Sequence, residues 1–303
     1  MPARMRGRRR HAGTTEDAGA DAGTTEDAGT DAGSTEDAGS DAGTSEDAGT
    51  DAGTPEDAGT DAGTPEDAGT PEDAGTDAGT DPGPSPVGTC PAGAIICESF
   101  SNGLNGWEPS AEHATITAEN GRLHIVTEDG HDERNEAGAV IARWSKSMPA
   151  FGTQLFVREY VFMRSLPGVF GQMGTLLVVA NLDSDFGGFE LQVISDSGFA
   201  LDDWSGRPGQ GWNRQPEPVL LGMSAGRWVC LEWELRRATL TSTHGNARVY
   251  VDGTLVHDFT NIGMRAFNVF VTGYGFVHPQ GPSGSETFID NVAVSSTARI
   301  GCE

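Results

Sequence analysis

Roughly a quarter of the chain lacks the apolar side chains that a folded core needs. Residues 11–87 contain no Lys, Arg, Cys, Phe, Trp or Tyr, and Val87 is their only large aliphatic residue. They carry 14 Asp and 7 Glu in repeats of Asp-Ala-Gly-Thr with Glu insertions. Because these repeats offer only Ala for burial, they cannot offset the conformational entropy lost on folding. The sequence therefore predicts a disordered acidic spacer at 11–87 and one folded domain at 88–303.

The charge distribution limits the partners that such a chain can have. Residues 1–10 carry five Arg and are expected to be disordered, but the whole chain has a net charge of −26. Phosphate backbones and anionic lipids would repel it, so we expect no nucleic-acid partner. No apolar run reaches the ~18 residues of a membrane span. The basic start resembles the first part of a secretory signal without its apolar part, so either the chain is cytoplasmic or its true start lies further upstream.

The folded part alternates short apolar runs with turn residues. β-Branched and aromatic residues recur at every second position, as in 228–235, where Val229 faces one side and Glu232 the other. Asp252-Gly253 is a typical two-residue hairpin turn. The predicted strands are 122–127, 138–144, 154–163, 175–182, 189–195, 228–235, 246–251, 267–276 and 287–294. With no helical stripe, this pattern predicts an all-β antiparallel sandwich of the jelly-roll type. Four tryptophans that lie in or at the ends of strand-like segments are expected in the core: Trp107, Trp144, Trp228 and Trp233.

The domain contains four cysteines, Cys90, Cys97, Cys230 and Cys302. An even count favours two disulfides, for which three connectivities exist. We prefer Cys90–Cys97, which closes a small loop, and Cys230–Cys302, which ties the last residues to a central strand. Zinc binding is disfavoured because the closely spaced cysteine pairs of zinc sites are missing. Disulfides indicate an oxidising compartment, whereas four free thiols in a cytosolic protein are the alternative.

Several motifs in this order resemble the concanavalin A-like lectin/glucanase superfamily over about 95–301. They are Cys97-Glu98-Ser99-Phe100 with Gly106-Trp107, then Trp228-Val-Cys-Leu-Glu-Trp with Arg248-Val-Tyr-Val-Asp-Gly, and finally Phe288-Ile-Asp-Asn-Val-Ala-Val. That superfamily includes laminin-G-like modules, legume-type lectins and family 16 glycoside hydrolases. The repeats at 11–87 look like the spacers of bacterial surface proteins. The resemblance implies a jelly-roll fold, but a fold does not determine an activity.

The resemblance allows a direct test for glycosidase activity. Family 16 enzymes carry Glu-x-Asp-x-x-Glu on one strand, and the two carboxyls that act in hydrolysis lie about 5 Å apart. Here Glu190 matches the first position, but Gln192 replaces the Asp and Ser195 replaces the second Glu. An amide and a hydroxyl cannot serve as nucleophile and general acid. We therefore do not expect hydrolysis by this route.

Jelly-roll polysaccharide lyases are a second enzymatic alternative. They need an Arg or Gln that neutralises the substrate carboxylate and a His or Tyr that acts as base. Residues of these types are Arg158, Gln192, Tyr274 and His278. None of them lies in a recognisable lyase motif, and Arg158 and Gln192 are equally typical of polar positions that face outward from strands.

The resemblance also implies a structural calcium ion where the first and last strands meet. Asp290 matches the Asp that supplies side-chain oxygens in this superfamily, and Glu98 and the turn Asn120-Gly121 match the partner segments. Calcium takes six to eight oxygens and accepts carbonyls, so one or two carboxylates would suffice. The alternative is that Asp290 only hydrogen-bonds a neighbouring strand. The acidic loop 181–185 is a second place for calcium, although such loops are more often solvated turns.

A polar loop with two tryptophans is the best candidate for sugar binding. Trp204 and Trp212 lie among Gly, Pro and charged residues in 201–214, together with Arg207 and Arg214. Sugars stack their apolar faces on aromatic rings while charged and amide groups bind the hydroxyls. The alternative is that both rings cover the edge of the sandwich. Candidate ligand-binding residues on nearby strands are Arg158, Glu190, Gln192 and Tyr274.

The sequence therefore predicts a secreted or surface-displayed jelly-roll domain that binds a glycan or polysaccharide without cleaving it and holds a structural calcium. Two alternatives remain open. One is a polysaccharide lyase or another glycan-cleaving enzyme, and the other is a laminin-G-like module that binds a surface protein.

Overall fold

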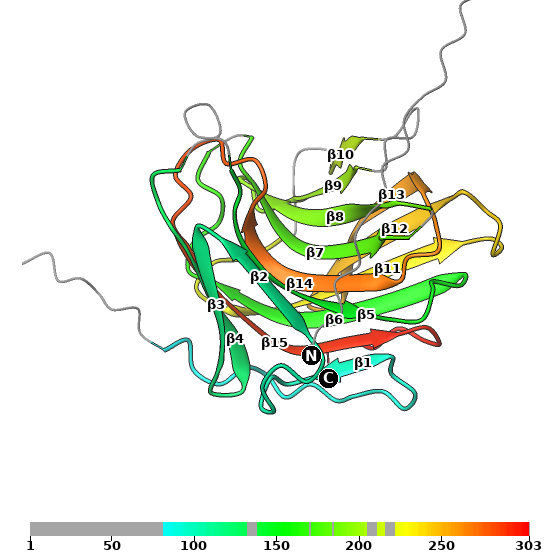
Figure 1. Cartoon of the computed structure of the whole chain (residues 1–303), viewed down its shortest axis with the longest axis horizontal. Helices are drawn as coiled ribbons and strands as arrows, with labels where there is room; N and C mark the ends of the chain where they lie inside the picture. The colour runs from blue at the N-terminus through cyan, green and yellow to red at the C-terminus, as the bar shows by residue number, and fades with distance from the viewer. Residues whose placement is uncertain are drawn as a thin grey trace, which may run out of the picture. The chain divides into compact units, whose positions relative to one another are not determined.

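The computed structural model describes residues 81–131, 138–169, 171–183, 185–204, 211–215 and 222–302. All regular structure in these ranges is β, in two antiparallel sheets that pack as a sandwich (Figure 1). The predicted all-β jelly roll is therefore confirmed. No helix long and apolar enough to cross a membrane occurs in the described ranges. The predicted basic segment and the spacer up to residue 80 lie outside them.

The first sheet has eight strands in the order β13-β12-β11-β6-β15-β4-β3, with β1 paired to β15. Its strands are β1 (Ile96–Glu98), β3 (Ala114–Glu119), β4 (Arg122–Thr127), β6 (Gln154–Met163), β11 (Trp228–Arg237), β12 (His244–Val251), β13 (Thr254–Gly263) and β15 (Ser285–Ser295). The order places the first and last strands of the domain side by side, so this sheet closes the fold.

The second sheet has seven strands in the order β10-β9-β8-β7-β14-β5-β2. Its strands are β2 (Glu108–Glu112), β5 (Val140–Ser147), β7 (Met173–Asn181), β8 (Gly187–Ile194), β9 (Phe199–Asp203), β10 (Trp212–Arg214) and β14 (Val269–Phe276). Strands β7, β8 and β14 are visibly curved in Figure 1. One face of this sheet packs on the core, and we call the opposite face the open face.

The core lies between the sheets and follows the period-two pattern of the strands. On β11, Val229, Leu231, Trp233 and Leu235 are completely buried. Each fully buried side chain of this size stabilises the fold by about 1.5–3 kcal/mol. The core also contains the predicted tryptophans Trp107, Trp144 and Trp233. The prediction for Trp228 is wrong, because its parity places it on the other face of β11. There it is half-buried, with its ring 5.8 Å from that of Phe162.

Each of the nine predicted strands overlaps an observed strand, and 122–127 and 154–163 agree at both ends. The hairpin at Asp252-Gly253 is confirmed, since both residues have positive φ and Val251 pairs with Thr254. The sequence did not predict β1, β2, β3, β9 or β10, and of β13 it predicted only the start, as the second arm of the hairpin. β2 and β3 are edge strands with many exposed residues, so their hydrophobic pattern is weak.

Both preferred disulfides, Cys90–Cys97 and Cys230–Cys302, are present in the structure. The second joins β11 to the C-terminal segment, which crosses the outer face of the eight-stranded sheet. A bond that closes a long loop restricts the unfolded chain and so stabilises the folded one by about 2–4 kcal/mol.

The last seven residues of the predicted spacer contact the sandwich. Asp81 forms an ion pair with Arg122 at 2.6 Å, and Arg122 also donates to the carbonyl of Gly83 at 2.8 Å. Ser85 donates a hydrogen bond to Asp290. Arg122 holds the pKa of the exposed Asp81 below its usual value, mainly by hydrogen bonding. The contacts of the folded domain thus begin at Asp81 in the described part of the chain.

Candidate functional site

The open face of the seven-stranded sheet carries a shallow pocket of about 240 Å³. Its lining combines apolar side chains with one arginine, one buried glutamate and one tryptophan. The lining residues are Ser110, Arg143, Ser145, Val178, Ala180, Leu182, Glu190, Trp204, Val269 and Val271. They come from β2, β5, β7, β8 and β14 and from the segments that follow β7 and β9, which shows that the face is assembled from distant parts of the sequence.

Glu190 is the buried acid of this pocket. Thr175 donates a hydrogen bond to its Oε2 at 2.8 Å, and the amide of Gln192 lies 3.5 Å from the same oxygen. Burial raises the pKa of Glu190, and the hydrogen bond from Thr175 and the charge of Arg143 oppose that shift only in part. A carboxyl group with a raised pKa can hold a proton at neutral pH and then donate it.

Asp202 is the partner of Glu190 in the register of β8 and β9, so both side chains lie on the open face. Burial raises the pKa of Asp202, whereas the nearby imidazole of His278 lowers it. His278 comes from the segment between β14 and β15 and is exposed. The register and the folding of this segment bring an imidazole and two carboxyl groups to one face.

Arg143 supplies the positive charge of the pocket. It lies on β5 beside the core residues Ala142 and Trp144, so its side chain points away from the core. Within the described residues the guanidinium group of Arg143 has no hydrogen bond or ion pair, although its charge acts on Glu190. Arg143 was not among the predicted site residues, because it occurs inside a plain strand pattern. Arg143 and Ser145 alternate along β5 with the core residues Ala142 and Trp144. This alternation is the signal that could have placed Arg143 on the open face.

Two buried polar atoms beside the pocket have no hydrogen-bond partner among the described residues. They are the amide oxygen of Gln192 and the indole nitrogen of Trp204. Such atoms cost free energy until a water molecule or a ligand group meets them. The ring of Trp204 lies against Gly188 and meets Phe186 edge-on at 5.5 Å. Trp204 therefore forms one wall of the pocket, as a sugar-stacking residue would.

The rest of the predicted sugar-binding loop is only partly described. Arg207 lies outside the described residues, as does the side chain of Trp212. Arg214 on β10 forms an ion pair with Asp196 at the edge of the sheet. Of the residues predicted to bind sugar, the structure brings Trp204, Glu190 and Gln192 together on the open face.

The residues predicted to bind calcium hydrogen-bond to protein donors. One oxygen of Glu98 accepts from the backbone of Phe100 at 2.9 Å, and the other accepts from Asn105 at 2.9 Å and Trp107 at 3.3 Å. Asp290 accepts from Ser85 and from the backbone N–H of Asn291. Burial raises the pKa of Asp290. N–H donors already point at both oxygens of Glu98, where a cation would have to bind. The surroundings of this carboxylate therefore fit calcium poorly.

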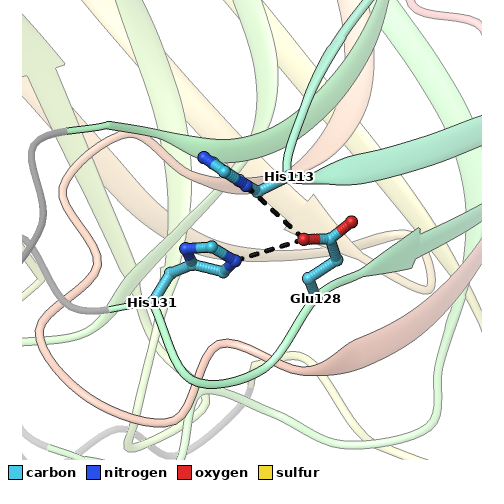
Figure 2. Close-up of side chains that lie close together, drawn as sticks. All are labelled: His113, Glu128 and His131. Atoms are coloured by element: carbon cyan, nitrogen blue, oxygen red, sulfur yellow. Dashed lines mark hydrogen bonds and ion pairs between the residues drawn. The ribbon is translucent and has the colours of Figure 1, made fainter.

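The turn Asn120-Gly121 connects β3 to β4, and both residues have positive φ. Gly121 packs against Ser99 and Ser101, next to the segment that follows Glu98. Among the described residues, two groups of at least three metal-ligating side chains occur elsewhere. One is His113, Glu128 and His131 (Figure 2), and the other contains the disulfide Cys230–Cys302 and cannot bind a metal through its sulfurs.

The calcium prediction is tested by thermal unfolding. A calcium ion bound only by the folded state would stabilise it, so chelation would lower the melting temperature and added calcium would restore it. The hydrogen bonds at Glu98 lead us to expect a shift of less than about 2 °C, against the several degrees that about 1 kcal/mol would cause. A larger shift, abolished by Asp290→Asn, would re-establish the calcium site.

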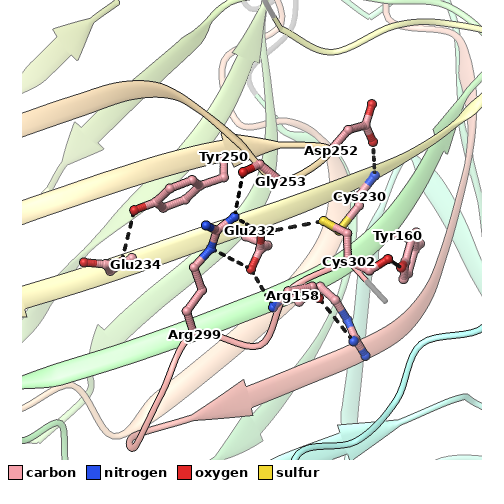
Figure 3. A network of polar contacts seen from close by, with 11 residues as sticks. Arg158, Tyr160, Cys230, Glu232, Glu234, Tyr250, Asp252, Gly253, Arg299 and Cys302 are labelled. Atoms are coloured by element: carbon pink, nitrogen blue, oxygen red, sulfur yellow. Dashed lines mark hydrogen bonds and ion pairs between the residues drawn. A yellow bond between two sulfur atoms is a disulfide. The ribbon is translucent and has the colours of Figure 1, made fainter.

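Arg158 and Tyr274 do not reach the open face. Arg158 lies on β6 on the outer side of the eight-stranded sheet, where it faces the carbonyls of Asn291 and Gly301 beneath the C-terminal segment (Figure 3). Tyr274 points into the core with Phe270 and Phe276. Burial raises the pKa of its phenol, which disfavours the phenolate that a base would need.

Comparison with solved structures reveals several proteins of similar fold, each with a TM-score of 0.50. A cellulose-induced protein, Cip1, is 13% identical over 69% of this chain and 100% of its own. An endo-β-1,4-glucuronan lyase from the fungus Trichoderma reesei is 16% identical over 67% and 96%. An alginate lyase, vAL-1, from Chlorella virus is 12% identical over 67% and 99%.

No protein-family model and no curated protein matches the chain. Identities of 12–16% to the solved structures establish likeness of fold only. That likeness covers nearly the whole length of each neighbour, and it is consistent with the concanavalin A-like jelly roll that the sequence resembles. The described part of this chain therefore shares its jelly-roll fold with these three proteins over nearly their whole length.

Proposed function

We propose that this protein binds an acidic polysaccharide on the open face of the seven-stranded sheet and cleaves it by β-elimination. The observation that carries the proposal is that Arg143, Glu190 and Trp204 line one pocket of that face. Gln192 and Asp202 lie beside Glu190, and the charge of His278 acts on Asp202. Two of the fold neighbours are named as lyases of glucuronan and alginate, which supports the same choice. This replaces non-catalytic glycan binding as the preferred function, since a binding site needs no buried acid with a raised pKa.

Elimination needs three kinds of group. A base removes the proton from the carbon next to the substrate carboxylate, and the electron pair left behind forms the new carbon–carbon double bond. The bond from the neighbouring carbon to the glycosidic oxygen breaks, and that oxygen leaves with a proton from an acid. Negative charge builds up on the substrate carboxylate during the first step, so cations and hydrogen-bond donors stabilise the transition state.

The residues of the open face fit these roles. Arg143 binds the substrate carboxylate through its planar guanidinium group, and Gln192 adds an amide beside it. His278 accepts the carbon-bound proton, and Asp202 stabilises the imidazolium that forms. Glu190, whose pKa is raised by burial, gives a proton to the leaving oxygen. Trp204 and the apolar residues beside it bind the faces of neighbouring sugar rings.

An extracellular location is part of the proposal. The two disulfides are typical of an oxidising compartment, and polysaccharides of this kind are extracellular polymers. The acidic repeats at 11–80 would then act as a spacer between the domain and its point of attachment.

The proposal is tested by incubating the full chain with alginate, glucuronan, polygalacturonate and a neutral β-glucan. We expect a rise in ultraviolet absorbance, from the unsaturated sugar at the new chain end, with at least one acidic polymer and none with the neutral glucan. Retention of an acidic polymer without any product would restore the lectin-like function. No response to any polymer would favour a protein-binding module.

A further inference from the structure

The turn between β2 and β3 brings two imidazoles and one carboxylate together, away from the pocket of the open face. Nδ1 of His113 lies 3.4 Å from Oε2 of Glu128, and Nε2 of His131 lies 3.2 Å from the same oxygen (Figure 2). All three potential ligand atoms lie within 4.8 Å of one another. The two rings lie close together, with their centroids 3.9 Å apart. We infer that these side chains form a binding site for a zinc-type transition-metal ion.

The backbone holds the three residues in place. His113 and Glu128 extend the β3–β4 hairpin, and the N–H of Glu128 donates to the carbonyl of His113 at 2.9 Å. Gly130 has a positive φ of 87°, which turns the chain so that His131 folds back towards Glu128. His113 itself has a φ of 47°, an uncommon value for a residue other than glycine.

The segment before β15 fixes the same loop. Asp129 accepts hydrogen bonds from the backbone of Ser283 at 3.1 Å and of Gly284 at 3.3 Å. The hydroxyl of Ser283 donates to the carbonyl of Glu128 at 2.7 Å. Little ordering entropy is then lost when an ion binds, because two neighbouring segments already position Glu128.

The spacing and the ligand types both favour zinc. Zn²⁺ binds nitrogen and oxygen at about 2.0–2.2 Å with tetrahedral geometry, so neighbouring ligand atoms lie about 3.3 Å apart. The observed separations of 3.2 and 3.4 Å match that value. Neutral imidazoles suit Zn²⁺, Cu²⁺ and Ni²⁺, whereas Ca²⁺ and Mg²⁺ prefer oxygen alone. His113 and Glu128 are largely exposed, so an ion can enter and a water molecule can occupy the fourth position.

A bound ion would tie together two parts of the fold. His113 lies where the chain passes from β2 in the seven-stranded sheet to β3 in the eight-stranded sheet. Glu128 and His131 follow β4 in the eight-stranded sheet. The ion would hold this crossover against the loop after β4. Because it would bind only the folded state, it would raise the free energy of unfolding.

The test titrates chelator-treated protein, without a histidine tag, with Zn²⁺ in a calorimeter. Excess Mg²⁺ is included to occupy the carboxylates of 11–87. We expect one high-affinity Zn²⁺ per chain and a higher melting temperature with Zn²⁺ than without. His113→Gln and His131→Gln should each weaken binding by more than about tenfold. His244→Gln, which changes an exposed histidine on another strand, should leave binding unchanged.

Replacement of Zn²⁺ by Co²⁺ gives a second readout, because tetrahedral Co²⁺ absorbs visible light strongly and hydrated Co²⁺ does not. Glu128→Gln keeps the shape of the side chain and serves as a further ligand variant if either histidine variant fails to fold. Absence of Zn²⁺ binding to the wild type would overturn the inference. Binding that survives in the ligand variants would do the same.

Discussion

Arg143→Ala is expected to lower the rate of polysaccharide elimination by about 10²–10³-fold, since it removes the cation that stabilises charge on the substrate carboxylate. The loss should appear mainly in kcat, because the charge grows as the carbon-bound proton leaves. Arg143→Lys should recover only part of the rate, since lysine keeps the charge but loses the planar pair of donors. Initial rates measured by ultraviolet absorbance on the best acidic polymer provide the measurement.

Arg227→Ala is the matched control for this prediction. Arg227 is an exposed arginine that pairs with Asp252 at 2.8 Å, outside the pocket of the open face. It should leave kcat unchanged, and the melting temperatures of both alanine variants should stay close to that of the wild type. An Arg143→Ala protein that folds and retains full activity would remove Arg143 from the mechanism.

Glu159→Gln is expected to make the protein more stable above neutral pH and to flatten the dependence of stability on pH. Glu159 is completely buried between the sheets, where Thr272 donates a hydrogen bond to it at 2.7 Å. Its other carboxyl oxygen has no partner among the described residues. Burial raises the pKa of Glu159 to about 8. At neutral pH the side chain is therefore protonated in the folded state and ionised in the unfolded state.

The sign of the effect follows from this difference. Below about pH 4.5 both states hold the proton, so Glu159 imposes no pH-dependent cost. As the pH rises towards 8, only the unfolded state releases the proton, and the free energy of unfolding falls by several kcal/mol. Urea unfolding at about pH 5, 7 and 9 measures the decline. The exposed control Glu108→Gln should show the same decline of the free energy of unfolding as the wild type. A Glu159→Gln protein with that decline would contradict the prediction.

The strands could be predicted because apolar side chains recur at every second position where one face of the strand packs on the core. The same alternation also indicates which side chains face the core and which face the site. Tyr274 shares its parity with Phe270 and Phe276, which predicts a core position and not a ligand-binding one. Glu190 and Gln192 have the opposite parity to Phe189 and Leu191, and the structure places them on the open face.

Other parts of the site depend on strand pairing, which local patterns do not determine. Glu190 meets Asp202 through the register of β8 and β9. Arg143 acts on Glu190 although β14 and β7 separate their strands. Contacts between such distant strands are set by the packing of the whole sandwich. The sequence did not predict that His113 and His131 lie together, because strand β3 of the hairpin that joins them has a weak hydrophobic pattern.

The mass of the reaction product, after digestion in water enriched in a heavy oxygen isotope, tests the central claim most directly. Elimination leaves a product that is lighter than the hydrolysis product by one water molecule and contains no oxygen from the solvent. We expect that product from an acidic polysaccharide, and we expect it to disappear in Arg143→Ala. A heavier product that contains solvent oxygen would show hydrolysis and contradict elimination on the open face.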